Sequence, residues 1–149
     1  MKKIITNINL IKSAIVFKVP MRVILNEKED DDTEVEITVV YDGKEYVGKG
    51  KDDLWLYAFV DLQKKLPKNI KIACCITCKH GNMCPFGDIP RELLCTKKLK
   101  ISDKSDIVDL FDDKVFYENN KTLCDSYCND YELQSDNYYT YSDYNYLVN

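Results

Sequence analysis

The sequence predicts an α+β fold, in which an antiparallel sheet carries one main helix and leads into a cysteine-rich second half. Apolar and polar residues alternate through most of residues 14–50, which is the period of half-buried strands. Apolar residues then recur at helical spacing over residues 55–66. All seven cysteines follow residue 73. We therefore expect a β-β-β-α-β order at the start of the chain.

The strands are predicted from their alternation and from the turn between two of them. Residues 14–25 form one strand, in which Pro20 indicates an edge position or a bulge because proline cannot donate to a ladder. Residues 33–41 form the next strand and residues 44–49 return alongside it. Between these two, Asp42-Gly43 is typical of a tight hairpin turn, which needs positive φ at both central residues.

The main helix is predicted to begin after Asp52 or Asp53, either of which would cap it, and to end before Pro67. We expect its apolar stripe to lie across the apolar face of the sheet. The stripe consists of Trp55, Ala58, Phe59, Leu62 and Leu66. A further strand is predicted over residues 69–76.

Length and charge limit the classes of protein to which the chain belongs. Its 149 residues predict one domain over residues 1–128 and an acidic, tyrosine-rich segment over residues 129–149. The formal charge of −4 argues against general binding to nucleic acid or to anionic membranes. No apolar run approaches the roughly 18 residues of a membrane span. Polar residues interrupt the apolar start, so a signal peptide is not predicted. We expect a cytoplasmic protein.

Two acidic segments are candidates for contact with a protein partner. Residues 27–32 hold five carboxylates but lack the spacing of a calcium loop, so the simpler interpretation is a solvated hairpin loop. Residues 125–149 hold five acids, no Lys or Arg and seven of the eleven tyrosines. The alternative for this segment is a solvated, loosely ordered terminus. The predicted partner-binding residues are Glu29, Asp30, Asp31, Asp136, Tyr138, Tyr139 and Tyr141.

The cysteines predict a structural zinc site. Cys75 and Cys78 have the spacing of a metal knuckle, in which two thiolates converge on one tetrahedral zinc. Cys95 and Cys124 are the best candidates for the other two ligands. Alternation in the preceding strand places Cys74 in the core instead. The remaining alternatives as ligands are His80, Cys84 and Cys128, and the alternative metal is an iron–sulfur cluster.

Three other uses of the cysteines stay open. In a secreted protein, the seven cysteines would form three disulfides and leave one free thiol. A reducing compartment disfavours disulfides. Cys75 and Cys78 have the spacing of a redox pair, although Gly81 and Pro85 break the helix that such a pair needs. A cysteine–histidine hydrolase would use His80 as its base, but no third orienting group stands at recognisable spacing. The last alternative is a set of buried thiols without ligand chemistry.

Short motifs of the second half also resemble an uncharacterised bacterial family of small cytosolic proteins, which look like immunity or accessory proteins of bacterial competition loci. The motifs are Cys75-x2-Cys78, Cys84-Pro85-Phe86-Gly87, Leu94-Cys95, the Lys104-to-Phe111 segment and Leu123-Cys124-Asp125-Ser126-Tyr127. The resemblance covers roughly residues 35–128. It implies that Cys75, Cys78, Cys95 and Cys124 belong together. Cys84 departs from the family, which has a small polar residue there.

The predicted function is a non-catalytic protein-binding module with a structural, cysteine-ligated zinc. The family resemblance favours an immunity protein that neutralises a cognate bacterial toxin. Its acidic segments would steer a basic toxin domain toward it. The alternative is a thiol-dependent redox protein or enzyme that uses the pair Cys75 and Cys78. The sequence does not define the oligomeric state.

Overall fold

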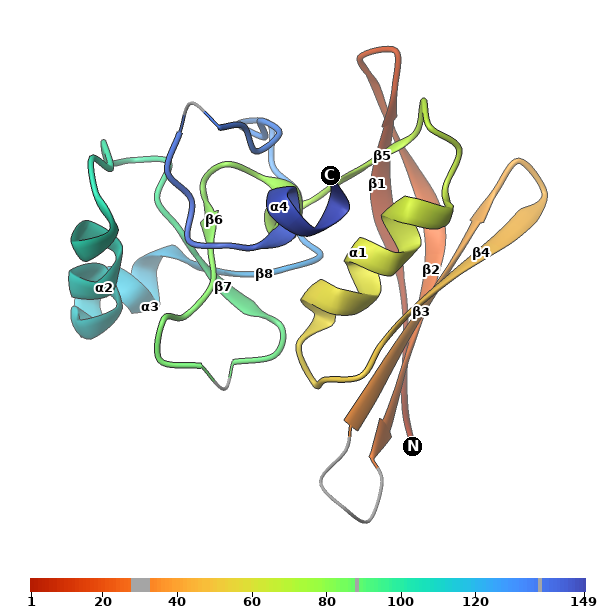
Figure 1. Ribbon diagram of the computed structural model, residues 1–149, viewed down its shortest axis with the longest axis horizontal. Coiled ribbons are helices and arrows are strands. Elements are labelled where there is room, and N and C mark those ends of the chain that lie inside the picture. The colour runs from red at the N-terminus through yellow and green to blue at the C-terminus, as the bar shows by residue number, and fades with distance from the viewer. Residues whose placement is uncertain (28–32, 88, 137) are drawn as a thin grey trace. The chain divides into compact units, whose positions relative to one another are not determined.

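The computed structural model describes residues 1–27, 33–87, 89–136 and 138–149. The chain divides into two compact units, residues 1–73 and residues 74–147, with Val148 grouped with the first and Asn149 with the second. The first unit is a curled antiparallel sheet with a helix packed on it, and all seven cysteines lie in the second. The predicted α+β class is therefore confirmed (Figure 1).

The sheet of the first unit has five strands in the order β4-β3-β2-β1-β5. The strands are β1 (Lys2–Lys12), β2 (Ile15–Glu27), β3 (Thr33–Tyr41), β4 (Lys44–Gly50) and β5 (Lys71–Ala73). The sequence predicts three strands before the helix, and the structure has four. The added strand β1 pairs with β2 over its whole length, from Lys2 opposite Leu25 to Lys12 opposite Ile15.

Two local predictions in this sheet have a clear outcome. The predicted edge position of Pro20 holds on one side only. β2 is an interior strand in which Pro20 lies opposite Asn7 of β1, but the ladder with β3 begins one residue later, at Met21 opposite Val39. The missing N–H therefore interrupts no ladder on that side. The predicted hairpin turn is confirmed, since Asp42 has φ of 53° and Gly43 has φ of 74°.

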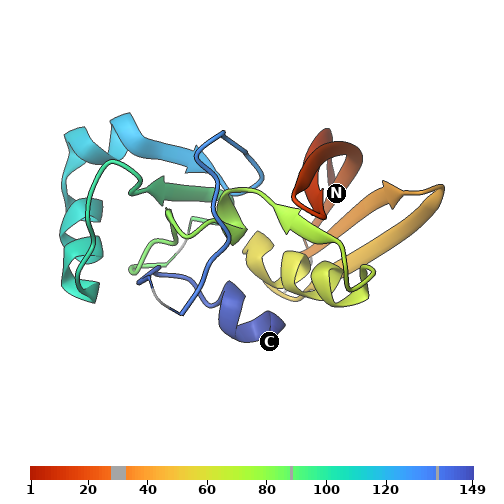
Figure 2. The same ribbon diagram turned by 90° about the horizontal axis from the view of Figure 1, so that it is seen from above.

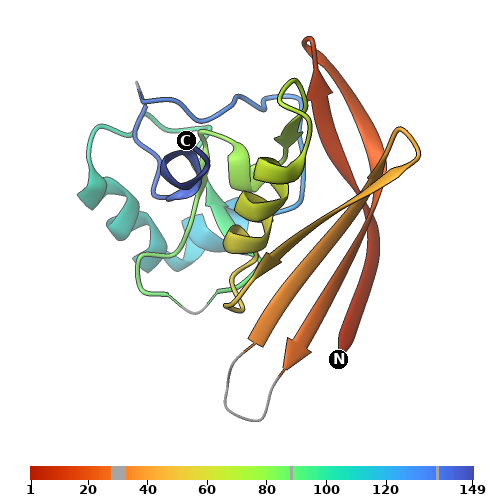
Figure 3. The ribbon, with the colours of Figure 1, turned by 45° about the vertical axis from the view of Figure 1, so that its right-hand side comes forward.

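Helix α1 (Trp55–Lys65) packs on β3 and β4 and covers one face of the sheet (Figure 3). Its buried stripe includes Trp55, Phe59 and Leu62, each at most 2% exposed. The predicted aspartate cap is wrong. The N-cap is Leu54, without a side-chain hydrogen bond, and Asp52 instead accepts from the Leu54 N–H at 3.4 Å.

The helix approaches β4 closely because that strand carries glycine at the contact. A Cβ atom on Gly48 would lie 2.3 Å from the Ala58 carbonyl oxygen and 2.6 Å from Leu62 Cβ. One on Gly50 would lie 2.8 Å from the Ala58 nitrogen. Side chains at these positions would therefore push the helix off the sheet.

The second unit is built on a three-stranded sheet with the order β6-β7-β8. Its elements are the 3₁₀ turn η1 (Cys75–Thr77), β6 (Gly81–Asn82), β7 (Glu92–Cys95), α2 (Lys104–Asp112), α3 (Lys114–Asn120), β8 (Lys121–Leu123) and α4 (Tyr144–Val148). Helices α2 and α3 pack on each other beside this sheet (Figure 2). The strand predicted over residues 69–76 ends at Ala73, where the chain enters η1.

None of the described helices is long and apolar enough to cross a membrane.

Candidate functional site

The two cysteines of the predicted knuckle lie on consecutive tight turns. The Cys78 N–H donates to the Cys75 carbonyl at 3.2 Å, and the Gly81 N–H donates to the Cys78 carbonyl at 3.0 Å. The N–H groups of His80 and Glu132 also donate to the Cys78 thiol. These backbone donors lower the pKa of Cys78, but burial raises it by more.

Gly81 is required for this turn. A Cβ atom there would lie 2.0 Å from the Cys75 carbonyl oxygen, so only glycine lets the chain double back so closely. Strand β6 then begins, and Gly81 is the register partner of Cys95 in β7. The Thr96 N–H donates to the His80 carbonyl at 2.9 Å, which extends the pairing between β6 and β7. The register of β6 and β7 thus brings Cys95 next to the knuckle.

The segment after β8 runs along the knuckle. The Cys75 N–H donates to the Ser126 carbonyl at 2.8 Å, and the Ile76 N–H donates to the Cys124 carbonyl at 2.9 Å. Cys128 follows two residues after Ser126, on a turn that the Tyr131 N–H closes by donating to the Cys128 carbonyl at 3.1 Å.

A cavity of about 300 Å³ lies between these segments, and Cys75, Cys95 and Cys128 line it. Cys78 lies on the same turn as Cys75 and acts electrostatically on it. We call these four residues the thiol cluster. Burial raises the pKa of Cys75 to about 11, and the other three thiols of the cluster add to the rise. Burial also raises the pKa of Cys78, to which Cys95 and Cys128 contribute in the same direction.

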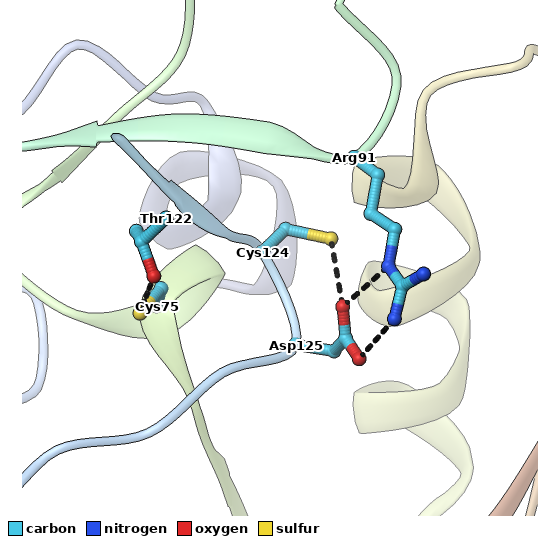
Figure 4. A network of polar contacts seen from close by, with 5 residues as sticks. All are labelled: Cys75, Arg91, Thr122, Cys124 and Asp125. Atoms are coloured by element: carbon cyan, nitrogen blue, oxygen red, sulfur yellow. Dashed lines mark hydrogen bonds and ion pairs between the residues drawn. The ribbon is translucent and has the colours of Figure 1, made fainter. Parts of the chain in front are cut away.

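Of the four predicted ligands, Cys75 and Cys95 line this cavity, Cys78 lies on the turn next to Cys75, and Cys124 does not line the cavity. Cys124 is 1% exposed, and burial, followed by the charge of Asp125, raises the pKa of its thiol. Figure 4 shows its Sγ directed at Asp125 Oδ1, 4.0 Å away, whereas Cys75 Sγ faces Thr122 Oγ1 at 3.5 Å.

As they stand, no three His, Cys, Asp or Glu side chains within residues 1–27, 33–87, 89–136 and 138–149 are placed to hold a metal ion. Cys75, Cys95 and Cys128 line one cavity, but the thiols of the cluster do not converge on one point. Cys74 is fully buried, as predicted, and its thiol accepts hydrogen bonds from the N–H groups of Ile76 and Thr77.

Sequence reasoning missed the ion pair that fixes the end of β8. Arg91 donates through Nε and a terminal nitrogen to the two carboxylate oxygens of Asp125, at 2.8 and 2.9 Å (Figure 4). The Asp125 side chain is only 7% exposed. The two residues lie 34 positions apart, in a chain with many charges, so no local pattern could pair them.

The acidic C-terminal segment is hydrogen-bonded to the knuckle. The Gln134 N–H donates to the Thr77 carbonyl at 3.0 Å, and Gln134 Nε2 donates to the Ile76 carbonyl at 3.0 Å. The Lys79 N–H donates to the Glu132 carbonyl at 2.8 Å. Gln134 is 6% exposed. This part of the segment is therefore built into the second unit.

The same segment forms a cavity of about 820 Å³. We call it the tyrosine cavity. Its lining consists of Gln134, Ser135, Asp136, Tyr138, Tyr139, Thr140, Ser142, Asn145, Tyr146 and Asn149. It contains three of the predicted partner-binding residues, namely Asp136, Tyr138 and Tyr139. The other acidic candidates, Glu29, Asp30 and Asp31, lie outside the described residues.

Lysines of the same chain already contact two of the tyrosines. Lys79 Nζ lies 5.1 Å from the centre of the Tyr138 ring, and Lys104 Nζ lies 5.6 Å from that of Tyr141. Tyr139 is 36% exposed and Tyr146 is 82% exposed. The rings most open to a partner are therefore Tyr139, which was predicted, and Tyr146, which was not.

His80, the only histidine, has no hydrogen-bond partner for its buried Nδ1 among the described residues. Its ring packs edge-on against the Tyr138 ring, with the ring centres 5.6 Å apart. Burial lowers the pKa of His80 below its usual value. A general base needs an orienting group on its second nitrogen, so this geometry does not favour hydrolysis.

Comparisons with protein-family models, with curated proteins and with solved structures find no match for this chain.

Proposed function

We propose that this chain is a non-catalytic protein-binding module of the reducing cytoplasm, in which a cysteine-bound zinc stabilises the second unit. The observation that carries the proposal is the thiol cluster on a knuckle whose backbone also anchors the tyrosine cavity. The same few residues, 76–79, donate to or accept from the C-terminal segment. A metal on this knuckle would therefore hold the partner surface in place.

Zinc suits this unit because its sheet is built from short strands. Its strands β6, β7 and β8 span only two to four residues each. A structural zinc contributes folding free energy directly, since the unfolded chain has no formed site. Zinc is the usual partner of clustered thiolates, and the spacing of these cysteines is not that of a ferredoxin cluster.

Thiol catalysis is less well supported. Reactive cysteines have a lowered pKa, so that the thiolate is present at neutral pH. Burial instead raises the pKa of Cys75 to about 11 and also raises that of Cys78. Without a metal, this pair is a poor nucleophile and a poor redox couple.

The partner we propose is a protein with an exposed basic segment, such as the toxin of an immunity pair. The segment over residues 125–149 carries no Lys or Arg and a charge of −5, although the whole chain carries only −4. Open tyrosine rings beside a carboxylate suit a lysine or arginine side chain, through cation–π contact and ion pairing. Tyr139, Tyr146 and Asp136 supply these groups in the tyrosine cavity.

A quantitative pull-down with the tagged full chain tests this surface. We expect the Tyr139→Ser, Asp136→Asn double variant to lose a basic partner that the parent chain retains. The Tyr57→Ser variant is the control, because Tyr57 is 39% exposed on α1. Salt at about 0.5 M should weaken the complex, since it screens charges beyond a few ångströms. Equal retention by the double variant, or an acidic partner, would contradict the proposal.

A further inference from the structure

We propose that the fourth zinc ligand is Cys128 and that Cys124 is a buried thiol outside the metal site. This inference rests on the structural zinc proposed above and specifies the residues that hold it. The site is then the thiol cluster: Cys75, Cys78, Cys95 and Cys128.

Geometry favours Cys128 over Cys124 as the partner of the knuckle. Cys128 lines the same cavity as Cys75 and Cys95, and Cys124 does not. The electrostatic neighbours agree, because Cys128 acts on both Cys75 and Cys78. Cys124 is not among the groups that shift the pKa of Cys78, although Cys75 is among those that raise the pKa of Cys124.

The charges around the cavity also favour this ligand set. Four thiolates and one Zn²⁺ carry a net charge of −2, which nearby cations would offset. Lys97 Nζ lies 3.8 Å from Cys128 Sγ, and Lys98 and Lys121 line the cavity as well. Cys124 Sγ instead lies 4.0 Å from a carboxylate oxygen of Asp125, which opposes a further negative charge.

Under this assignment, the thiols converge on the metal through rotation of their side chains. Each cysteine has one side-chain torsion before its sulfur, and staggered rotamers interconvert without displacing the backbone. The backbone is already fixed on both sides, by the Cys75 N–H to Ser126 carbonyl bond of 2.8 Å and by the pairing of Gly81 with Cys95. Cys128 is exposed, so its thiol can turn into the cavity without opening a core.

Metal-dependent alkylation of the reduced full chain separates the two cysteines without any mutation. Cys128 is exposed in the structure, so it should react with iodoacetamide when the protein is metal-free. Adding zinc chloride should protect it, because a zinc-bound thiolate is a poor nucleophile. Cys124 is 1% exposed and should be protected with or without zinc. Cys84, which is half-buried and outside the cluster, should react equally in both states.

Titration with cobalt(II) tests the same assignment by spectroscopy. The parent chain and Cys124→Ala should each bind one equivalent with the charge-transfer bands of a tetrahedral four-thiolate site. Cys128→Ser should bind about 100- to 1,000-fold more weakly, since each of four ligands supplies about a quarter of a binding free energy of about 10–16 kcal/mol.

The outcomes distinguish the two levels of the proposal. The assignment to Cys128 is wrong if bound zinc leaves Cys128 reactive toward iodoacetamide. It is also wrong if Cys128→Ser keeps the four-thiolate cobalt spectrum while Cys124→Ala loses it. In both cases the zinc proposal stands. If the parent chain binds neither zinc nor cobalt, the structural zinc is absent and the assignment falls with it. The pull-down with tyrosine-cavity variants would still test partner binding separately.

Discussion

Two glycines let backbone segments within each unit approach closely because glycine has no Cβ atom. At Gly81 a Cβ would lie 2.0 Å from the Cys75 carbonyl oxygen, and this contact sets the shape of the knuckle. At Gly48 it would meet both Ala58 and Leu62 of α1. The two positions lie in different units, so substitutions there should act on different parts of the chain.

We expect Gly48→Ala to lower the free energy of unfolding by about 1–3 kcal/mol, the usual cost of overpacking a buried contact. The added methyl would overlap the helix backbone, which cannot move aside as a flexible side chain would. Chemical denaturation with fluorescence from Trp55, the only tryptophan, measures the change. Glu45→Ala, at an exposed position of the same strand, should stay within about 0.5 kcal/mol. Equal stability of Gly48→Ala and the parent would contradict the close packing.

The predicted ligand set shows where residue-level reasoning from the sequence ends. The spacing of Cys75 and Cys78 predicts their knuckle, and Cys95 lines the same cavity as Cys75. The choice between Cys124 and Cys128 depends on how the chain leaves β8. The ion pair of Arg91 with Asp125 fixes the course of the chain after β8. A pair 34 positions apart cannot be recognised from local sequence.

At the scale of elements, α1 is tied to β4 by a polar contact as well as by apolar packing. Asp61 Oδ2 accepts from the Lys49 N–H and from Lys65 Nζ, each at 2.8 Å. Partial burial raises the pKa of Asp61, but hydrogen bonds from Lys65 and the Lys49 N–H outweigh it and hold the pKa below 3.8. The ionised carboxylate therefore stabilises the folded first unit.

We expect Asp61→Asn to cost about 0.5 kcal/mol at pH 7, a value reduced for solvent screening because the side chain is 33% exposed. A lowered folded pKa gives stability that is present above the unfolded pKa and lost as pH falls through the folded pKa. The gap between parent and variant should therefore stay constant from pH 7 to about 5 and close below about 4. Denaturation at several pH values measures it, with Glu45→Gln as the control. A gap that widens in acid would contradict this contact.

Elements with a strong periodic pattern were predicted well, and irregular ones were not. Strand β3 and the turn after it match the prediction because alternation and the Asp42-Gly43 pair are local signals. Strand β1 was not among the three predicted strands, because the consecutive residues Ile8, Asn9 and Leu10 are all buried and break the alternation. The turn η1 replaces the end of a predicted strand because the knuckle bends the chain after Cys74.

At the scale of the whole chain, the two units differ in what holds them together. The first has long strands and a helix with a fully buried aromatic stripe. The second has short strands, and backbone hydrogen bonds join the knuckle to the C-terminal segment. The sequence could not predict these bonds, because backbone donors and acceptors carry no side-chain pattern. We therefore expect the metal to matter for the second unit alone.

Hydrogen exchange of the reduced protein, with one equivalent of zinc and after chelation, tests this central claim most directly. We predict that chelation removes protection from the amides of Cys75, Lys79 and Gln134, which pair the knuckle with later segments. The amides of β2 and β3 should keep their protection in both states. Equal protection of the knuckle amides with and without zinc would show that no metal stabilises this unit, and would contradict the proposed structural site.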